Sequence, residues 1–143
     1  MTKRKFGDNS EKKAAKKVKG KAIKGSGCLW YDKGDYSTEN IIFQNKATKN
    51  DSYQLKIAEF DKAKKDALTK NKDFVFSIQL QDQWIYCFER VMIDEILEKE
   101  LKLTPITINK CLKVDADMNY LINDKYVVIN EYLFLNTVAK KII

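Results

Sequence analysis

The sequence predicts an α/β protein with a mixed central β-sheet flanked by helices. Segments with strand character alternate with segments of helical spacing along the chain. With 143 residues, 44% of them hydrophobic, the chain can bury one core but is too short for two. We therefore expect a single domain over residues 10–143, with a core at 10–100, a C-terminal extension at 101–143 and a flexible basic arm at 1–9.

The expected elements follow from apolar spacing and turn residues. Ser10 can cap a short helix whose narrow apolar stripe is Ala14, Ala15 and Val18. Apolar residues at the even positions of 73–80 predict a strand with one strongly buried side. The other elements expected are strands at 40–46, 52–57, 83–88, 106–109 and 126–129, and helices at 58–68, at 92–101 and after the cap Asn130. Residues 20–39 should turn tightly and the segment around 110–125 should be irregular, which leaves a sheet of four or five strands.

The basic charge of the chain is concentrated at its N-terminus. The net charge is +7, and residues 1–25 hold ten Lys and Arg against Asp8 and Glu11, which leaves −1 for the rest. Lysines that neutralise phosphates release condensed counterions and so drive binding to a polyanion. Nucleic acid is the leading candidate partner, and a solubility tail or localisation signal is the alternative.

The composition also excludes several classes of protein. The chain has no histidine, which removes Ser/His/Asp and Cys/His triads and His-ligated zinc. Glycine patterns of nucleotide-binding loops are absent. Cys28, Cys87 and Cys111 are odd in number and far apart, which predicts reduced thiols. No apolar stretch approaches the roughly 20 residues that span a bilayer, so we expect a cytoplasmic protein without a membrane partner, whose catalysis uses carboxylates, lysine and a metal.

Three residues have a spacing suited to metal-dependent phosphodiester hydrolysis, which needs hard oxygen ligands around Mg²⁺ and a group that positions the attacking water. Asp35 ends the glycine-rich segment, nine residues before Gln44. Lys46 should share a strand face with Ile42 and Gln44, because side chains alternate along a strand. A turn-forming role for Asp35 and a solvated strand end for Lys46 are the simpler alternatives.

Four ordered motifs carry a resemblance to a known family. They are Ser26-Gly27-Cys28-Leu29-Trp30, Lys33-Gly34-Asp35, Ile42-Phe43-Gln44-Asn45-Lys46-Ala47-Thr48 and Ser52-Tyr53-Gln54-Leu55-Lys56. With the helix at 58–68, they make residues 11–88 resemble the archaeal-type and phage Holliday junction resolvases of the PD-(D/E)XK nuclease superfamily. The resemblance implies a restriction-endonuclease-like fold, a Mg²⁺-dependent endonuclease in which Mn²⁺ can substitute, branched double-stranded DNA such as a four-way junction as substrate, a homodimer, and a bacterial or phage-infected cell.

The resemblance also implies roles for individual residues. Glu11, Asp35 and Gln44 would bind the metal, Lys46 would orient or activate the water, and Ser26 would lie beside the scissile phosphate. Glu11 is equally well explained as a charge at a helix N-terminus. Around this site we expect DNA contacts from Lys12, Lys13, Lys16, Lys24, Ser26, Gly27, Lys33, Lys49, Tyr53 and Lys56.

Gln44 is a departure, because the family carries a glutamate at this position. An amide oxygen brings no charge to a metal, so activity should be low or absent. Three explanations are open: a natural variant that tolerates glutamine, a nuclease fold that keeps only DNA binding, or a change made to trap a substrate complex. Glu39 is a candidate substitute ligand, although strand alternation puts it on the other face. The competing functions are a catalytically inactive DNA- or RNA-binding protein and a different nuclease of the superfamily with sequence preference on linear duplex.

Overall fold

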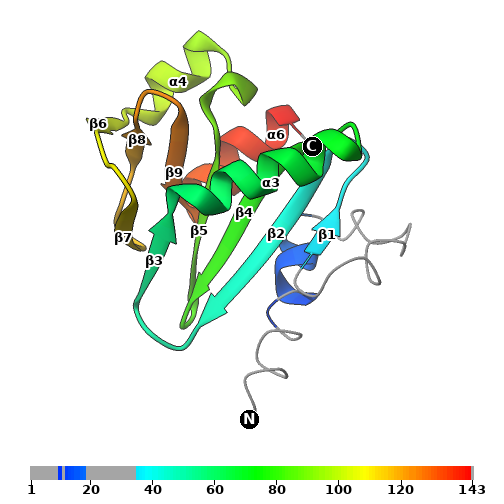
Figure 1. Cartoon of the computed structure of the whole chain (residues 1–143), viewed down its shortest axis with the longest axis horizontal. Helices are drawn as coiled ribbons and strands as arrows, with labels where there is room; N and C mark the ends of the chain where they lie inside the picture. Colours follow the sequence, from blue (N-terminus) through cyan, green and yellow to red (C-terminus); the bar gives the residue numbers. More distant parts are fainter. Residues whose placement is uncertain (1–9, 11, 19–34, 143) are drawn as a thin grey trace.

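The computed structural model describes residues 10, 12–18 and 35–142, apart from the side chains of Asp35, Ile96 and Glu98. Its main feature is a seven-stranded mixed sheet of order β1-β2-β4-β5-β9-β8-β6, beside a two-stranded sheet of β3 and β7 (Figure 1). The strands are β1 (Asp35–Ser37), β2 (Ile41–Thr48), β3 (Ser52–Lys56), β4 (Asp73–Leu80), β5 (Gln83–Glu89), β6 (Thr104–Ile106), β7 (Cys111–Asp115), β8 (Tyr120–Ile122) and β9 (Tyr126–Asn130). The predicted α/β class with a mixed sheet is confirmed.

Helices lie on both faces of this sheet (Figure 1). Strands β2 and β4 are parallel, so the chain must cross over between them, and α3 (Ile57–Thr69) supplies the crossover on one face. The N-terminal helix, described at residues 10 and 12–17, lies on the opposite face with the C-terminal helices. The remaining helical elements are η2 (Arg90–Met92), α4 (Glu95–Leu101), α5 (Glu131–Leu133), a π-helical turn η3 (Phe134–Val138) and α6 (Ala139–Ile142).

Two apolar cores pack against the two faces, and β2 shows how its residues divide between them. Ile42 belongs to the core under α3, while Ile41 and Phe43 belong to the core under the N-terminal and C-terminal helices. The predicted alternation of side chains along this strand is therefore confirmed. The second core also buries the apolar stripe predicted for the first helix, Ala14, Ala15 and Val18.

Strand β4 differs from its prediction, because both of its sides are buried rather than one. Val75 and Ser77 are as inaccessible as Phe74 and Phe76. The strand lies between β2 and β5, and helices cover it from both faces. Ser77 is therefore a polar residue inside a core.

The sheet is also larger than predicted. Strands β7 and β8 lie in the segment predicted to be irregular, and β1 lies in the segment predicted to be a tight turn. Strands β1 and β8 have only three residues each, so their sequences carry almost no alternation that could reveal them. Tertiary pairing with β2 and β9, rather than local propensity, defines them.

Element boundaries near the middle of the chain need correction as well. Helix α4 begins at Glu95 rather than at residue 92, because the Asp94 side chain accepts a hydrogen bond from the backbone N–H of Leu97 at 2.7 Å and caps the helix there. The strand predicted at 106–109 is β6, where Pro105 is tolerated because β6 is an edge strand. Asn130 is the helix cap that was predicted, accepting from the N–H of Leu133.

Candidate active site beside strand β2

The pairing of β1 with β2 brings two predicted site positions next to each other. Asp35 is the register partner of Gln44, and Tyr36 is the partner of Phe43. Directly opposed residues of an antiparallel pair have Cα atoms about 4.5–5.5 Å apart. The rings of Tyr36 and Phe43 stack at 4.6 Å between centroids, in the core on the side of the sheet away from α3. The backbone thus meets the spacing that a shared metal site requires, while the side chain of Asp35 lies outside the described part of the structure.

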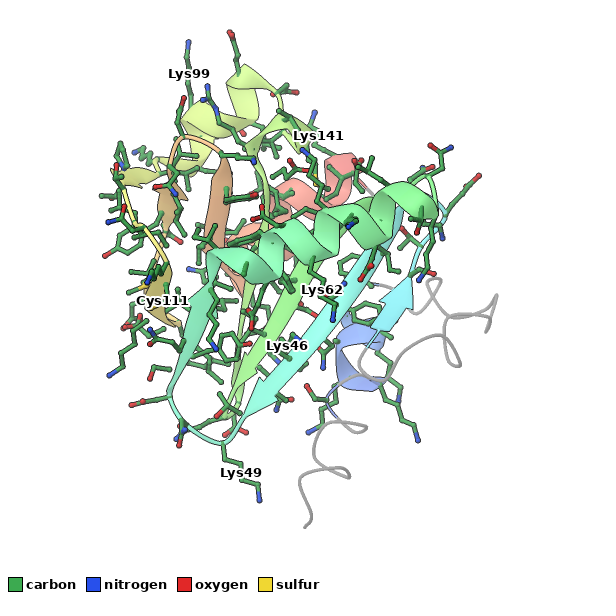
Figure 2. All side chains as sticks on the ribbon, in the orientation of Figure 1. Lys46, Lys49, Lys62, Lys99, Cys111 and Lys141 are labelled. Carbon is green, nitrogen blue, oxygen red and sulfur yellow. The ribbon has the colours of Figure 1, made fainter. Side chains whose placement is uncertain are left out.

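Gln44 and Lys46 lie on the α3 side of β2, where both side chains are half-buried. Figure 2 shows Lys46 on β2 and Lys62 on the helix that crosses this face. Within the described residues, neither Gln44 nor Lys46 has a hydrogen-bond or ion-pair partner. A partly desolvated ammonium group is more stable with an anion beside it. Because no anion among the described residues pairs with Lys46, this side chain can contact a bound phosphate or a water molecule.

Within the described residues, β1 pairs with β2 from Asp35 opposite Gln44 to Ser37 opposite Ile42, and no described strand pairs on that side with residues 45–48. Asn45 is buried in this stretch, while residues 46–48 are half-buried.

A chain of buried hydrogen bonds ties the elements of this region together. Tyr36 Oη donates to Ser77 Oγ at 3.0 Å, Ser77 Oγ donates to Asn45 Oδ1 at 2.8 Å, and Asn45 Nδ2 donates to Ser10 Oγ at 2.9 Å. These four residues come from β1, β4, β2 and the N-terminal helix, and we call them the polar chain. Asn45 stands between Gln44 and Lys46 in β2 but faces the other side of the sheet, so the polar chain holds the first helix on the face opposite the candidate site.

The remaining predicted site residues divide into two groups. Glu11, Lys24, Ser26, Gly27 and Lys33 lie outside the described residues. Lys12, Lys13 and Lys16 are exposed on the N-terminal helix, Lys49 is exposed in the turn after β2 (Figure 2), and Lys56 is exposed at the end of β3. The described lysines are thus exposed, and their contact with DNA stays a prediction.

Tyr53, which was expected to contact DNA, has a structural partner in the protein. It is half-buried, and its hydroxyl donates to Glu59 Oε1 at 2.9 Å. Burial, together with the negative charge of Glu59, raises the pKa of Tyr53. The hydroxyl therefore holds β3 against the first turn of α3.

The position of Glu39 does not support its suggested role as a substitute ligand. Glu39 is exposed in the turn between β1 and β2, at the opposite end of β1 from Asp35. Three strand residues separate the start of β2 from Gln44, which is about 10 Å of strand. Among the residues that the structure describes, no three Cys, Asp or Glu side chains gather to hold a metal ion, although Glu11 and the side chain of Asp35 are not among them.

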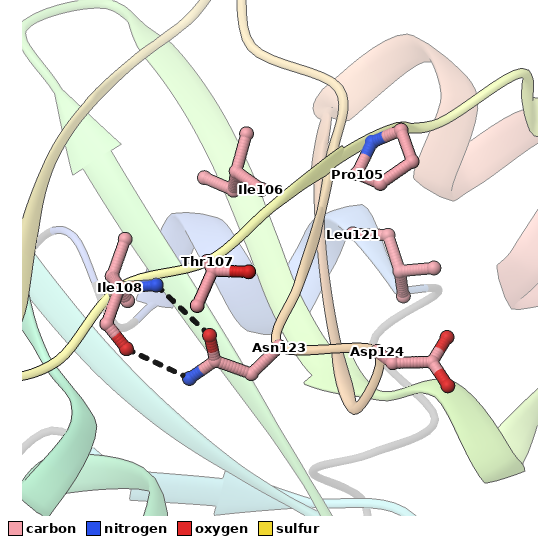
Figure 3. Close-up of a pocket in the computed structure, with 7 residues that line it drawn as sticks. All are labelled: Pro105, Ile106, Thr107, Ile108, Leu121, Asn123 and Asp124. Carbon is pink, nitrogen blue, oxygen red and sulfur yellow. Dashed lines mark hydrogen bonds between the residues drawn. The ribbon is translucent and has the colours of Figure 1, made fainter.

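The structure has a second candidate cavity at the other edge of the sheet, a shallow pocket of about 650 Å³ beside β6 and β8 (Figure 3). It is lined by Pro105, Ile106, Thr107, Ile108, Leu121, Asn123 and Asp124. The amide of Asn123 is engaged by the backbone of Ile108 at 2.9 and 3.1 Å, and Asp124 pairs with Arg90 at 2.6 Å. The side chains of Asn123 and Asp124 are therefore already bonded within the protein. The described residues that line this pocket include no cluster of reactive side chains.

Sequence reasoning missed two functional candidates, Asn45 and Gln79. Asn45 belongs to the polar chain. Gln79 is 5% exposed in β4, and its amide oxygen has no hydrogen-bond partner in the part of the chain that the structure describes. The available signal was a polar residue inside an otherwise apolar strand. Such a residue must either find partners within the core or serve a ligand.

Comparisons with known proteins do not assign the chain to a family: no family model matches it, and no curated protein or solved structure is significantly similar to it. None of the described helices is long and apolar enough to cross a lipid bilayer.

Proposed function

We propose that this protein is a Mg²⁺-dependent endonuclease that acts on branched DNA, with a restriction-endonuclease-like fold and the cytoplasm of a bacterial or phage-infected cell as its place of action. The observation that carries the proposal is the register of β1 against β2, which sets Asp35 opposite Gln44 with Lys46 two residues further on. A mixed sheet with helices on both faces agrees with the fold implied by the resemblance.

The donor atoms at these positions suit magnesium. Asp35 offers a carboxylate and Gln44 an amide oxygen, both hard oxygen ligands of the kind that Mg²⁺ prefers. Asp35 and Gln44 would hold the ion from the α3 face of β2, whereas the helix that carries Glu11 packs on the opposite face of the sheet, so the part that the resemblance implies for Glu11 has no support from this packing. When bound, the ion neutralises charge that develops on the phosphate during hydrolysis.

Lys46 has a distinct role in this arrangement. Its ammonium group is half-buried and has no anionic partner within the described residues. It can donate hydrogen bonds to the attacking water and to a phosphate oxygen, which orients the water for in-line attack. Gln44 can accept a hydrogen bond or touch a cation but cannot balance charge.

DNA would be held mainly by its backbone. Lys12, Lys13 and Lys16 on the N-terminal helix and Lys49 after β2 are exposed. Contacts from such lysines position a nucleic acid without reading its sequence. A homodimer would supply the two matched cuts that a four-way junction needs.

The test compares cleavage by the chain and by Gln44→Glu on a labelled synthetic four-way junction with Mg²⁺ or Mn²⁺. We expect Gln44→Glu to cut faster by roughly 10²-fold, the size of effect seen when one transition-state group is lost or restored. Adding Lys46→Ala or Asp35→Ala to that variant should abolish the gain. Binding of the junction by Gln44→Glu without any cutting would reject the enzyme.

Gln44 itself favours one alternative, a nuclease fold that binds nucleic acid without cutting it. Such a protein would bind DNA or RNA with an affinity that falls steeply with salt. Its binding would be indifferent to Asp35→Ala and to Lys46→Ala, and neither it nor Gln44→Glu would cut.

A further inference from the structure

A basic pocket of about 320 Å³ lies on the face of the sheet opposite Lys46, between the N-terminal helix and the hairpin of β4 and β5. The residues that line it are Lys13, Lys16, Lys17, Gln79, Asp82 and Trp84. Two walls therefore form the pocket: a helix that contributes lysines and a hairpin that contributes an amide and an indole.

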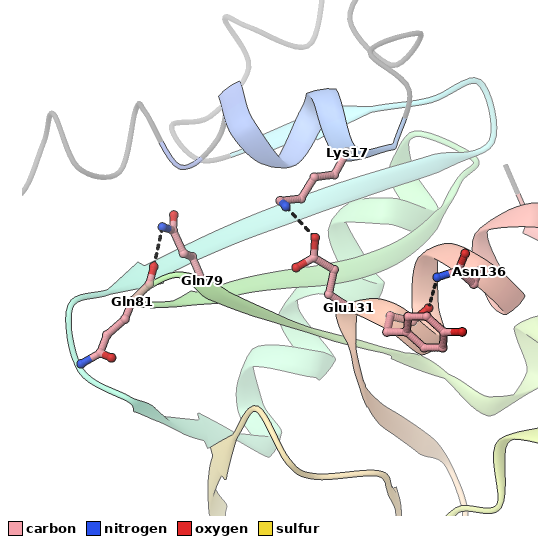
Figure 4. A network of polar contacts seen from close by, with 6 residues as sticks. Lys17, Gln79, Gln81, Glu131 and Asn136 are labelled. Carbon is pink, nitrogen blue, oxygen red and sulfur yellow. Dashed lines mark hydrogen bonds and ion pairs between the residues drawn. The ribbon is translucent and has the colours of Figure 1, made fainter.

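The lysines of the helix wall differ in how they are used. Lys17 donates to Glu131 at 2.5 Å (Figure 4). Its ammonium group also lies 5.7 Å from the centre of the Trp84 ring. Lys13 and Lys16 are exposed and have no ion-pair partner among the described residues. Residues three apart share a helix face, so these two present adjacent positive charges to the pocket, against the single carboxylate of Asp82.

Gln79 supplies an independent indication of a ligand. Its side chain is 5% exposed, and its Nε2 donates to the backbone carbonyl of Gln81 at 2.7 Å. Its Oε1 is buried and has no hydrogen-bond partner among the described residues. Figure 4 shows this oxygen projecting from β4 on the side of the sheet where the N-terminal helix lies. A buried acceptor without a donor is rare in folded proteins and calls for an explanation.

We propose that this pocket binds one nucleotide unit of a nucleic-acid strand. Lys13 and Lys16 would contact its phosphate, and Gln79 Oε1 would accept a hydrogen bond from an amino group of its base. A phosphodiester group of a strand carries no hydrogen-bond donor, so the donor for Gln79 Oε1 would come from the base of the same nucleotide. The assignment of this nucleic-acid strand to branched DNA rests on the proposed function.

The place of the pocket in the sheet indicates which strand it holds. Ala47 is the register partner of Gln79, and Lys46 is the partner of Ile78. The pocket and the candidate active site therefore lie at neighbouring residue pairs of β2 and β4, but they open on opposite faces of the sheet. A branched substrate can place one strand on each face, so the pocket would hold a strand other than the one that is cut.

The experiment measures binding of the full chain, without divalent metal, to a labelled four-way junction and to a linear duplex of matched sequence. We expect Lys13→Ala/Lys16→Ala to weaken junction binding by roughly tenfold and to lower the salt slope by about 1.8, the value for two lost phosphate contacts. Lys140→Ala/Lys141→Ala, which removes two exposed lysines from α6, is the charge-matched control and should change neither. The effect on the linear duplex should be smaller.

A second variant separates a ligand contact from a structural role. Gln79→Leu removes the unpaired acceptor and also the hydrogen bond that Nε2 donates to the Gln81 carbonyl. The unfolding equilibrium constant of the free protein should therefore rise by no more than about fivefold, which lowers the free energy of unfolding by no more than about 1 kcal/mol. Junction affinity should nevertheless fall by about fivefold, the equivalent of one hydrogen bond, with no change in salt slope. Wild-type affinity in both Gln79→Leu and the double lysine variant would overturn the proposal.

These outcomes are distinct from failure of the proposed nuclease. If Gln44→Glu cuts junctions while the pocket variants bind normally, the pocket proposal alone is wrong. If the pocket variants lose affinity while Gln44→Glu does not cut, the proposal of nucleotide binding is supported and the proposal of nuclease activity is rejected. Binding of no nucleic acid by any variant would overturn both.

Discussion

The hydrogen bonds of the polar chain predict a large loss of stability when a single residue is changed, Asn45→Ala. Asn45 joins Ser77 at 2.8 Å and Ser10 at 2.9 Å, and both partners are almost completely buried. Each buried hydrogen bond contributes about 0.5–1.5 kcal/mol, and removing side-chain volume from a packed site adds to this. We therefore expect the free energy of unfolding to fall by about 2–3 kcal/mol, a substantial part of the roughly 5–15 kcal/mol that stabilises a domain.

Urea unfolding followed by circular dichroism measures this loss. With a slope of about 1–3 kcal/mol per molar urea, the midpoint should fall by about 0.7–3 M. Asn50→Ala is the matched control, because Asn50 is exposed in the turn after β2 and should change stability by less than about 0.5 kcal/mol.

A double-mutant cycle tests whether the four residues act as one unit. Tyr36→Phe removes the donor that reaches Ser77 Oγ at 3.0 Å and should cost about 1 kcal/mol. Because Tyr36 and Asn45 both bond to the Ser77 hydroxyl, the two changes should be non-additive by at least about 0.5 kcal/mol. An Asn45→Ala midpoint equal to that of the wild type, or strict additivity, would refute the reasoning.

Three further predictions concern the core under α3. Phe60→Ala should reduce the free energy of unfolding by about 3–5 kcal/mol in the same urea assay, because Phe60 is fully buried and stacks on Tyr126 at 4.0 Å; a loss below 1 kcal/mol would contradict the packing. In a Cys28→Ser chain, one thiol should react quickly with an aromatic disulfide reagent and one only on unfolding, since Cys111 is exposed and Cys87 buried; two fast thiols would be the contrary result. Burial raises the pKa of the Cys87 thiol above its ordinary value of 9.0, so the unfolded chain loses this proton first and stability should fall above that pH by up to about 1.4 kcal/mol per pH unit, an effect that Cys87→Ala should diminish.

The parts of the fold that sequence predicted are those with strong periodicity. Strands β4 and β5 and helix α3 were placed within a residue or two because apolar residues recur in them at the spacing of their element. The short strands β1, β7 and β8 were missed because they exist through pairing with neighbours, which no local pattern encodes. The first helix was recognised by its small apolar stripe, whereas Ser10, the residue predicted to cap it, lies in the helix and is a long-range hydrogen-bond partner of Asn45.

The candidate site was predictable only in part for a related reason. Strand alternation correctly separated Ile42 from Ile41 and Phe43, and so put Gln44 and Lys46 on one face. The pairing of Asp35 with Gln44 is a tertiary fact that spacing alone leaves open. The polar chain was hidden because Asn45 and Ser77 lie 32 residues apart and meet only when β2 and β4 pair.

The neutral Gln44 has a consequence for the metal dependence of any cleavage. At positions 35, 44 and 46 the formal charges are −1, 0 and +1, which cancel, so a divalent cation gains little net attraction from these three residues. Gln44→Glu makes the sum −1, and hard cations bind more tightly as ligand charge increases. The Mg²⁺ concentration for half-maximal junction cleavage should therefore fall in Gln44→Glu, whereas a glutamine that serves only packing would leave that concentration unchanged.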